Sequence, residues 1–377
     1  MSINYYLSRF LNFVLGFLPK QNKIVFINFQ GHGYGDSPKY IANEIIRQAL
    51  PYDLVWLVCD MNNPFPKGIR KVKFYSFKSR FELSTARIIV SNTKGRLPYY
   101  KNKSQYYIQT WHGGFGIKYI EKDAEKYLPE KYISDSKYDS SITDLILSGS
   151  EFQTKVIQDS FWYNGEIFKK GVPRNDIFFN CSEEFINQLR NRYGFNTNCK
   201  IVIYAPTFRD DYSVDAYKID AVSLLKALRK KTGENWKMII RLHPRIAGMS
   251  HIFNFDNDII DGSRFADSQE LLVMSDLLIT DFSSMMMDFG IMKKPVILFI
   301  TDLEEYVQKC RGIRPLFYQL PFQLCKSNEE LCQAVVKFDV VDYRDRLKAF
   351  MDKYFLSYDD GHASEHVVER IKERMEI

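Results

Sequence analysis

The chain has 377 residues, of which 45% are apolar and 26% charged, and its formal net charge is +6. This length and composition allow two hydrophobic cores, because single domains seldom exceed roughly 250 residues, and they exclude a disordered chain. The mild positive charge suits an acidic substrate or an anionic surface better than dedicated binding of duplex DNA.

The first segment in the chain is an aromatic and aliphatic stretch over residues 3–18, which contains Arg9 and is followed by Lys20. It is too short and too interrupted to cross a bilayer about 30 Å thick, and it lacks the cleavage site of a secretory signal. Two interpretations stay open. The segment is either a helix packed on the protein's own surface or one that lies in a membrane interface with its aromatic face down.

The first half of the chain alternates strand-like and helix-like stretches. A strand over 23–29 leads into a Gly-rich turn and a helix over 39–49, and further strands are expected over 54–58, 87–91, 106–109 and 145–147. This order is typical of a parallel α/β sheet. The Gly-x-Gly-x-Gly turn is not the dinucleotide fingerprint and no Walker lysine follows it, so neither motif is assigned.

A histidine follows the strand expected over 106–109. His112 stands between a tryptophan and two glycines, at the sheet edge where proteins of this class bind ligands. Its ordinary pKa range suits proton abstraction near neutral pH, so we predict that it is a site residue. The charge-dense stretch over 121–137 is either a solvated helical face or a surface that meets lipid headgroups or a polyanion.

A second α/β half starts at Lys200, after a Pro-containing turn over 171–176 that reads as the end of the first domain. Its strands are expected over 201–204, 236–240, 277–279 and 296–300, and polar residues follow each of them. Parallel strands end at one edge of a sheet, so we expect these side chains to converge on one cleft. They are Arg209, Arg241, His243, Arg245, Asp281, Ser283 and Ser284.

Two helix starts in this region are able to receive a phosphate. The turn after 277–279 opens an apolar helix, whose first N–H groups and dipole favour an anion, unless Asp281 or Ser283 only caps it. Near the carboxyl end, Ser364 is expected to cap a helix with two aspartates close by, which offers a second such site.

Six ordered motifs together resemble those of the CDP-glycerol glycerophosphotransferase family, which includes wall teichoic acid primases and polymerases and related capsule enzymes. The match runs from about Lys23 to the end of the chain. The motifs are Gln109-Thr110-Trp111-His112-Gly113, Gly171-x-Pro173-Arg174-Asn175-Asp176, Tyr204-Ala205-Pro206-Thr207-x-Arg209-Asp210, Arg241-Leu242-His243-Pro244, Thr280-Asp281-Phe282-Ser283-Ser284 with Asp288, and Asp360-Gly361-x-Ala363-Ser364.

The chain departs from this family at three places. Gly114-Phe115-Gly116 stands where the family usually has Thr-Pro-Leu. The family usually has a basic residue at the position of His362 and often has Arg at the position of His366. These departures flank the acceptor and diphosphate sites that the resemblance implies.

The resemblance implies an α/β, GT-B-like fold of two Rossmann-like domains facing across a cleft, with an N-terminal amphipathic helix. The expected parts are a membrane-associating helix (1–20), an acceptor-binding domain (21–178), a CDP-polyol-binding domain (179–345) and a helical segment carrying part of the diphosphate site (346–377). It also implies peripheral attachment to the cytoplasmic face of the cell membrane.

The activity that the resemblance implies is transfer of a polyol phosphate from CDP-glycerol, or alternatively CDP-ribitol. A hydroxyl of a lipid-linked glycan, or of a growing teichoic-acid or capsule polymer, attacks the polyol-bearing phosphorus in line, and CMP leaves. His112 is the expected general base, and His243 is the expected hydrogen-bond donor to the diphosphate or to CMP. The substrate-binding residues are Thr207, Arg209, Arg241, Asp281, Ser283, Ser284, Gly361 and Ser364.

No cofactor or metal is indicated. The pairs Asp210-Asp211 and Asp359-Asp360 lack convincing ligand spacing, and the six cysteines contain no Cys-x-x-Cys pair, which is typical of a reducing compartment. Two rival functions stay open, a GT-B glycosyltransferase that uses a nucleotide sugar and a catalytically silent membrane scaffold for polymer assembly. A homo-oligomer also stays open. No nucleic-acid partner is expected, because no basic stripe with interleaved aromatics occurs outside the segments proposed to meet a membrane.

Overall fold

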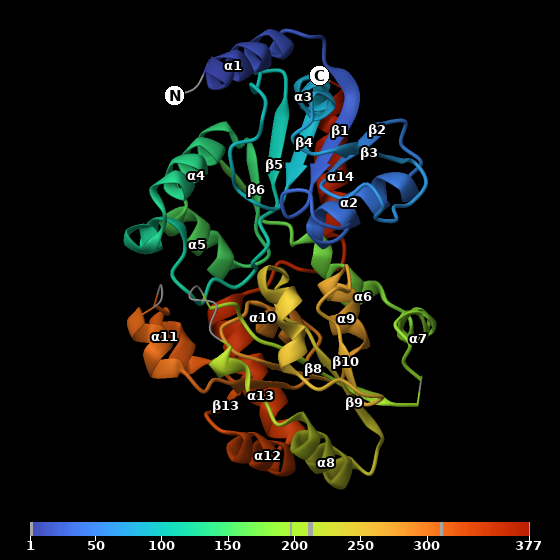
Figure 1. Cartoon of the computed structure of the whole chain (residues 1–377), viewed down its shortest axis with the longest axis vertical. Helices are drawn as coiled ribbons and strands as arrows, with labels where there is room; N and C mark the ends of the chain where they lie inside the picture. Colours follow the sequence, from blue (N-terminus) through green and yellow to red (C-terminus); the bar gives the residue numbers. More distant parts are fainter. Residues whose placement is uncertain (1–2, 197, 210–213, 310–311, 377) are drawn as a thin grey trace. The chain divides into compact units, whose positions relative to one another are not determined.

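The computed structural model describes residues 3–196, 198–209, 214–309 and 312–376, which form two compact units (Figure 1). Unit 1 comprises Met1–His112, Leu128–Asp176 and Ser357–Ile377, and unit 2 comprises Gly113–Tyr127 and Ile177–Leu356. The expected division grouped residues 113–127 with the first domain and kept 346–377 together. In the structure, residues 113–127 belong to unit 2, because Arg314 donates to the Gly116 carbonyl and pairs with Asp123.

Unit 1 is built on a seven-stranded parallel sheet with the order β3-β2-β1-β4-β5-β6-β7. The strands are β1 (Gln21–Ile27), β2 (Asp53–Val58), β3 (Ile69–Lys73), β4 (Ala86–Ser91), β5 (Tyr106–Gln109), β6 (Leu145–Leu147) and β7 (Glu166–Phe168). Alternate residues of β1 enter two different cores, with Ile24 in one and Val25 in the other. The sheet is therefore covered on both faces, as parallel sheets generally are.

The helices of unit 1 come from both ends of the chain. They are α1 (Ile3–Gly16), α2 (Asp36–Arg47), α3 (Phe77–Thr85), α4 (Glu130–Ile142), α5 (Glu151–Ser160), the short 3-10 turn η2 (Pro173–Asn175) and α14 (Ala363–Met375). Val367, Val368 and Ile371 of α14 lie in one core with α2 and the central strands (Figure 1). Their spacing makes one apolar stripe on the helix, which explains why this distant segment packs here.

Unit 2 repeats the plan with a six-stranded parallel sheet in the order β10-β9-β8-β11-β12-β13. The strands are β8 (Lys200–Ala205), β9 (Trp236–Ile240), β10 (Ile259–Asp261), β11 (Leu277–Thr280), β12 (Val296–Phe299) and β13 (Gln323–Cys325). One face packs against α8 (Ala221–Thr232) and α12 (Asn328–Lys337) in a single core. The two parallel sheets confirm the expected Rossmann-like α/β fold class.

The other elements of unit 2 are shorter or lie outside the sheet. The α-helices are α6 (Ile177–Asn180), α7 (Glu183–Arg192), α9 (Ser268–Met274), α10 (Met285–Ile291), α11 (Leu303–Lys309) and α13 (Val340–Phe350). The 3-10 helices are η1 (Glu121–Tyr127), η3 (Asp215–Tyr217), η4 (Pro244–Ile252) and η5 (Pro315–Gln319), and η6 (Met351–Phe355) is a π-helix. None of the helices in the described ranges is long and apolar enough to cross a membrane.

Candidate active site

His112 lies directly after β5 in unit 1, where the sequence placed it. The preceding residue, Trp111, has a φ of +55°, in the left-handed region, and the chain bends there. The Nδ1 atom of His112 lies 2.8 Å from the backbone oxygen of Asn92. A carbonyl oxygen only accepts hydrogen bonds, so in the neutral ring the proton sits on Nδ1 and the lone pair on Nε2. The exposed imidazole thus carries its hydrogen-bond acceptor on Nε2.

Two loops hold this ring in place. The fully buried Asn92 accepts a hydrogen bond from the Phe29 amide at 2.8 Å and donates one to the Asn28 side chain at 2.8 Å. The Phe29 ring meets the His112 ring edge-on, with 5.6 Å between centroids. The ends of β1 and β4 therefore fix the histidine, although neither asparagine stood out in the sequence.

A buried carboxylate fixes the turn before the histidine. The Trp111 amide donates to Oε1 of Gln109 at 3.0 Å, and Nε2 of Gln109 donates to Asp139 at 3.3 Å. Asp139 also accepts from the Tyr107 hydroxyl at 2.9 Å and the Gly95 amide at 3.1 Å. Burial raises the pKa of Asp139 to about 6, even though these hydrogen bonds lower it.

The predicted cap at the start of α14 is wrong. The N-cap residue is His362, and the amides of Ala363 and Ser364 both donate to the Asp176 carboxylate, at 2.9 and 2.7 Å. Asp176 is a carboxylate 188 residues away in sequence, and it already occupies the positive end of this helix. Gly361, with a φ of +90°, supplies the left-handed turn that precedes the helix.

Unit 2 brings together three of the predicted residues after β8 and β11. The buried Asp281 accepts hydrogen bonds from the Thr207 amide at 2.8 Å and from the Phe282 amide at 2.6 Å. Its other oxygen lies 2.9 Å from Nη1 of Arg209. Asp281 therefore joins the two loops rather than capping α10, while the Ser283 hydroxyl accepts from the Met285 amide at 3.3 Å.

Arg209 is only 5% exposed and its guanidinium is surrounded by carboxylates. It donates to both oxygens of Asp302, at 2.6 and 2.9 Å, as well as to Asp281. Burial lowers the pKa of Arg209, but the two carboxylates outweigh it and raise the pKa above its ordinary value. The sequence expected this arginine to pair with a phosphate, whereas the structure directs its donors to protein groups.

Arg241 and His243 follow β9. Nη1 of Arg241 donates to the carbonyls of Gly262 and Phe265, at 3.0 and 2.8 Å, so this arginine braces the neighbouring loop. The exposed His243 packs its ring near Phe208 and accepts the Arg245 amide on Nδ1 at 3.2 Å. An amide only donates, so the proton of the neutral ring sits on Nε2. His243 thus presents a donor where His112 presents an acceptor.

The predicted residues divide between the units. His112, Gly361 and Ser364 belong to unit 1, and the other predicted site residues belong to unit 2. Across the described ranges, no group of three or more His, Cys, Asp or Glu side chains could hold a metal ion. The Asp210-Asp211 pair and Cys310 lie outside the described residues.

Two Rossmann-like parallel sheets, each with a histidine after one of its strands, define an α/β protein of two units. The chain belongs to the CDP-Glycerol:Poly(glycerophosphate) glycerophosphotransferase family, whose profile matches residues 10–373. The resemblance drawn from the six motifs is therefore confirmed.

Individual relatives agree with this family. The chain is 32% identical over 362 residues to a teichoic acid poly(glycerol phosphate) polymerase of Staphylococcus epidermidis, covering 92% of this chain and 50% of that protein. It is 28% identical over 378 residues to a teichoic acid glycerol-phosphate transferase of Staphylococcus aureus, covering 95% of each. The chain thus spans about half the length of the first relative.

A solved structure covers the whole fold. It is that of the wall teichoic acid polymerase TagF soaked with CDPG, which is 28% identical and has a TM-score of 0.85. The match covers 100% of this chain and 99% of that one.

Proposed function

We propose that this protein transfers a polyol phosphate from a CDP-polyol to a hydroxyl of a lipid-linked glycan or a growing teichoic-acid or capsule polymer, with release of CMP. Family membership and the hydrogen bonds that orient the two histidines support this function. Glycerol phosphate is the proposed unit and ribitol phosphate the alternative, because the two relatives described above are glycerol phosphate enzymes.

The proposed chemistry is an in-line displacement at phosphorus. Nε2 of His112 removes the proton of the acceptor hydroxyl as its oxygen bonds to phosphorus, and the bond from phosphorus to CMP breaks. The Nε2–H group of His243 donates to the diphosphate and stabilises the charge that develops on CMP. Unit 1 supplies the acceptor site and the base, and unit 2 supplies the donor site.

The donor site is proposed to use hydroxyl groups and fixed positive charge. Thr207, Ser283 and Ser284 contact the diphosphate, and Arg241 contributes positive charge beside them. Arg209 acts through Asp281, whose carboxylate fixes the Thr207 loop. Gly361 and Ser364 shape the turn that begins α14, where Asp176 already accepts the two amides.

The observation that carries this proposal is the Nδ1 hydrogen bond of His112, because it leaves Nε2 as the base. The test is release of CMP from CDP-glycerol, CDP-ribitol and nucleotide sugars in the presence of a glycan-lipid acceptor. Removing a general base lowers a rate by about 10²–10⁴, so His112→Ala and His243→Ala should each reduce CMP release to that extent. His251→Ala is the control, since His251 is an exposed histidine of η4 that we give no role.

If His112→Ala keeps most of its activity, His112 is not the general base of this reaction. Turnover of a nucleotide sugar, without turnover of either CDP-polyol, would favour the glycosyltransferase function instead.

We also propose that α1 attaches the protein peripherally to the cytoplasmic face of the membrane. The helix is held on unit 1, because Arg80 donates to the Asn12 side chain at 2.7 Å and Leu15 is buried. Phe10 of the helix and Phe17, which directly follows it, are 68% and 71% exposed. Exposed aromatics on an interfacial helix insert at the boundary between headgroups and acyl chains.

Sedimentation with anionic phospholipid vesicles tests this attachment. The double variant Phe10→Ser and Phe17→Ser should lose most vesicle binding and keep CMP release with a water-soluble acceptor. Unchanged sedimentation of this variant would assign α1 to the protein's own surface alone.

A further inference from the structure

A single buried glutamine contacts both segments that hold His112. Gln109 is the last residue of β5 and is fully buried. Its Oε1 atom accepts the Trp111 amide at 3.0 Å, and its Nε2 atom donates to the Thr93 carbonyl at 3.2 Å. Thr93 directly follows Asn92, whose carbonyl lies 2.8 Å from Nδ1 of His112. One side chain therefore joins the segment that carries the imidazole to the segment that supplies its hydrogen-bond acceptor.

The orientation of the Gln109 amide follows from the chemistry of its partners. The Trp111 N–H group only donates and the Thr93 carbonyl only accepts, so the reversed amide would place like groups against each other at both ends. Nε2 has further acceptors in the Tyr107 hydroxyl at 3.1 Å and the Asp139 carboxylate at 3.3 Å. Unpaired polar groups are costly in a buried site, so these partners hold the side chain in one arrangement.

The turn that Gln109 holds is strained. Trp111 has a φ of +55°, and a large side chain in this left-handed region persists only where the surroundings maintain it. The hydrogen bond to Gln109 is one such restraint, and the edge-on contact with the Phe161 ring, 5.0 Å between centroids, is another. Without the glutamine, the turn can relax to a negative φ and move His112 away from Asn92.

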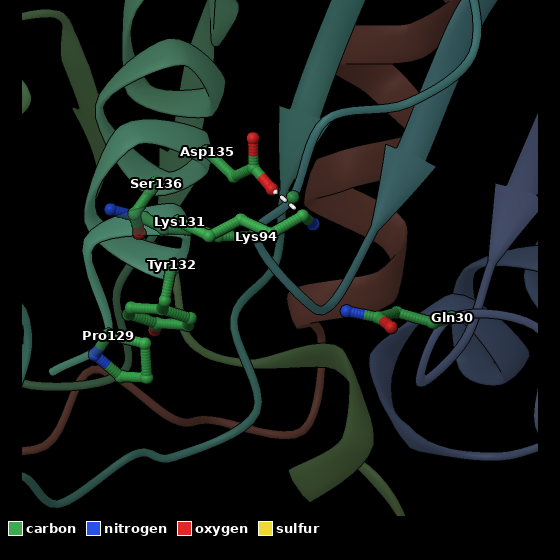
Figure 2. Close-up of a pocket in the computed structure, with 8 residues that line it drawn as sticks. Gln30, Lys94, Pro129, Lys131, Tyr132, Asp135 and Ser136 are labelled. Atoms are coloured by element: carbon green, nitrogen blue, oxygen red, sulfur yellow. Dashed lines mark hydrogen bonds and ion pairs between the residues drawn. The ribbon is translucent and has the colours of Figure 1, made fainter. Parts of the chain in front are cut away.

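The loop after β4, which carries the acceptor of the imidazole, has less support on its other side. Lys94 and Gly95 of this loop line an open pocket of about 280 Å³ together with residues of α4 (Figure 2). Packing is incomplete there, so the loop depends on hydrogen bonds to buried groups. The Gly95 amide donates to Asp139 at 3.1 Å, and the Thr93 carbonyl accepts from Gln109.

The tautomer of His112 depends on this loop and this turn. The hydrogen bond that a neutral imidazole makes sets which of its nitrogens carries the proton. The Asn92 carbonyl keeps the proton on Nδ1 and leaves the lone pair on Nε2. A shift of either segment removes this acceptor and allows the other tautomer, in which Nε2 carries the proton and cannot remove one from a hydroxyl.

We propose that Gln109 is a positioning residue that fixes the tautomer of His112 and thereby keeps Nε2 available as the base. This inference rests on the proposed function and deepens it. Gln109 acts through the backbone of Trp111 and of the loop after β4, all within unit 1, whereas the proposed donor site belongs to unit 2. Its substitution therefore changes turnover and leaves donor binding unaltered.

Gln109→Met is the test variant, and Gln105→Met is its matched control. Gln105 directly precedes the same strand and is also buried. Its Nε2 atom donates to the carbonyls of Leu83 and Ala86, both at 2.8 Å, and its Oε1 atom accepts the Asn102 amide at 3.0 Å. The two glutamines thus share their burial and their kind of contacts, and they lie at opposite ends of β5.

The tautomer is measured from long-range proton–nitrogen correlation spectra of protein with isotope-labelled histidine. The pH is about 8.5, roughly two units above the ordinary histidine pKa, so that the rings are neutral. The signals of His112 are assigned by their loss in His112→Asn. Wild type and Gln105→Met should show the proton on Nδ1. In Gln109→Met the ratio of the two tautomers should change on the order of tenfold, the effect of about one hydrogen bond.

Turnover should follow the tautomer. We expect kcat for CMP release to fall about 10²-fold in Gln109→Met, the effect of a misplaced catalytic group, with the KM for CDP-glycerol close to wild type. Gln105→Met should keep both constants. If Gln109→Met does not fold, Gln109→Asn takes its place, with Gln105→Asn as control. Its side chain keeps the amide but is one methylene too short to reach both segments, so the same changes are expected.

Three results overturn the proposal. They are an unchanged tautomer in the Gln109 variant, an equal loss of kcat in the Gln109 and Gln105 variants, and a shifted tautomer with wild-type kcat.

The two measurements separate this inference from the proposed function. If wild type releases no CMP from either CDP-polyol, the proposed function fails, while a tautomer that shifts only in the Gln109 variant still supports the positioning role. CMP release that His112→Ala abolishes but Gln109→Met leaves unchanged refutes the positioning role alone.

Discussion

Replacing Arg209 distinguishes a residue that binds the donor from one that holds the protein together. Its guanidinium donates to Asp302 twice, to Asp281, and to the Thr207 carbonyl at 2.6 Å. The group is almost fully buried and also lies 4.9 Å from the centre of the Tyr306 ring. Every one of these contacts is to protein, so the structure predicts that the first effect of a substitution is on stability.

The size of the effect follows from the two carboxylates. Arg209→Leu leaves the buried Asp281 and the partly buried Asp302 without their cation, and breaking a buried pair in this way costs about 3–5 kcal/mol. Arg209→Lys keeps the charge but loses the planar fork, so it should cost roughly half as much. The control is Arg229→Lys, because Arg229 pairs with Asp258 at 2.6 Å but both side chains are more than one-third exposed. That pair contributes at most about 1 kcal/mol.

Hydrogen exchange followed by mass spectrometry is the suitable assay, because two units need not unfold as one. We expect faster exchange in β8, β11 and the turns after them in both Arg209 variants, with unit 1 unchanged. The KM for CDP-glycerol, measured at a temperature where each variant stays folded, completes the experiment. Unchanged protection with a strongly raised donor KM in Arg209→Lys would refute this reasoning and restore the direct phosphate contact that the sequence suggested.

Three further predictions concern carboxylates. Burial raises the pKa of Asp139 from 3.8 to about 6, which corresponds to roughly 3 kcal/mol, so its protonation stabilises the fold at low pH and this stability is lost as the pH rises through 6. The melting temperature of wild type, compared with that of Asp139→Asn, should therefore fall between about pH 4 and 6 and change little above that range, and a constant difference would contradict the assignment. Asp176→Ala should cost about 1–2 kcal/mol and speed exchange at the start of α14, where it removes the acceptor of two amides. Glu82→Gln should lower the free energy of unfolding by several kcal/mol in a urea titration. The reason is that the buried ammonium of Lys23, which lies 2.6 Å from Glu82, loses its counter-charge. The control is Lys155→Gln at an exposed pair, which should change the free energy of unfolding by less than about 0.5 kcal/mol.

The central strands could be predicted from the sequence because they are buried on both faces. β1, β4, β8 and β9 each contain a run of three or more apolar residues, and a strand that is covered on both sides needs such a run. The four edge strands β3, β7, β10 and β13 were not predicted. A strand at the edge pairs on one side only, so it can be short, like the three residues of β10, or carry charges, like Ile69–Lys73.

The site could be predicted only where local sequence decides it. Strand ends placed His112, His243 and Asp281 correctly at the carboxyl edges of the sheets. Their partners depend on tertiary contacts, such as Asn28 with Asn92 across 64 residues, and no local pattern marks them. The same limit made the Ser364 cap wrong, because a local rule cannot anticipate a carboxylate that arrives from 188 residues away.

The return of α14 to the first sheet has a consequence for the synthesis of the chain. Unit 2 has all its residues once Leu356 has been made, whereas unit 1 still lacks three fully buried residues of its core, Val367, Val368 and Ile371. Domains generally fold as their residues become available during translation. In this chain unit 2 therefore has all its residues before unit 1 does, although unit 1 contains the residues that are made first.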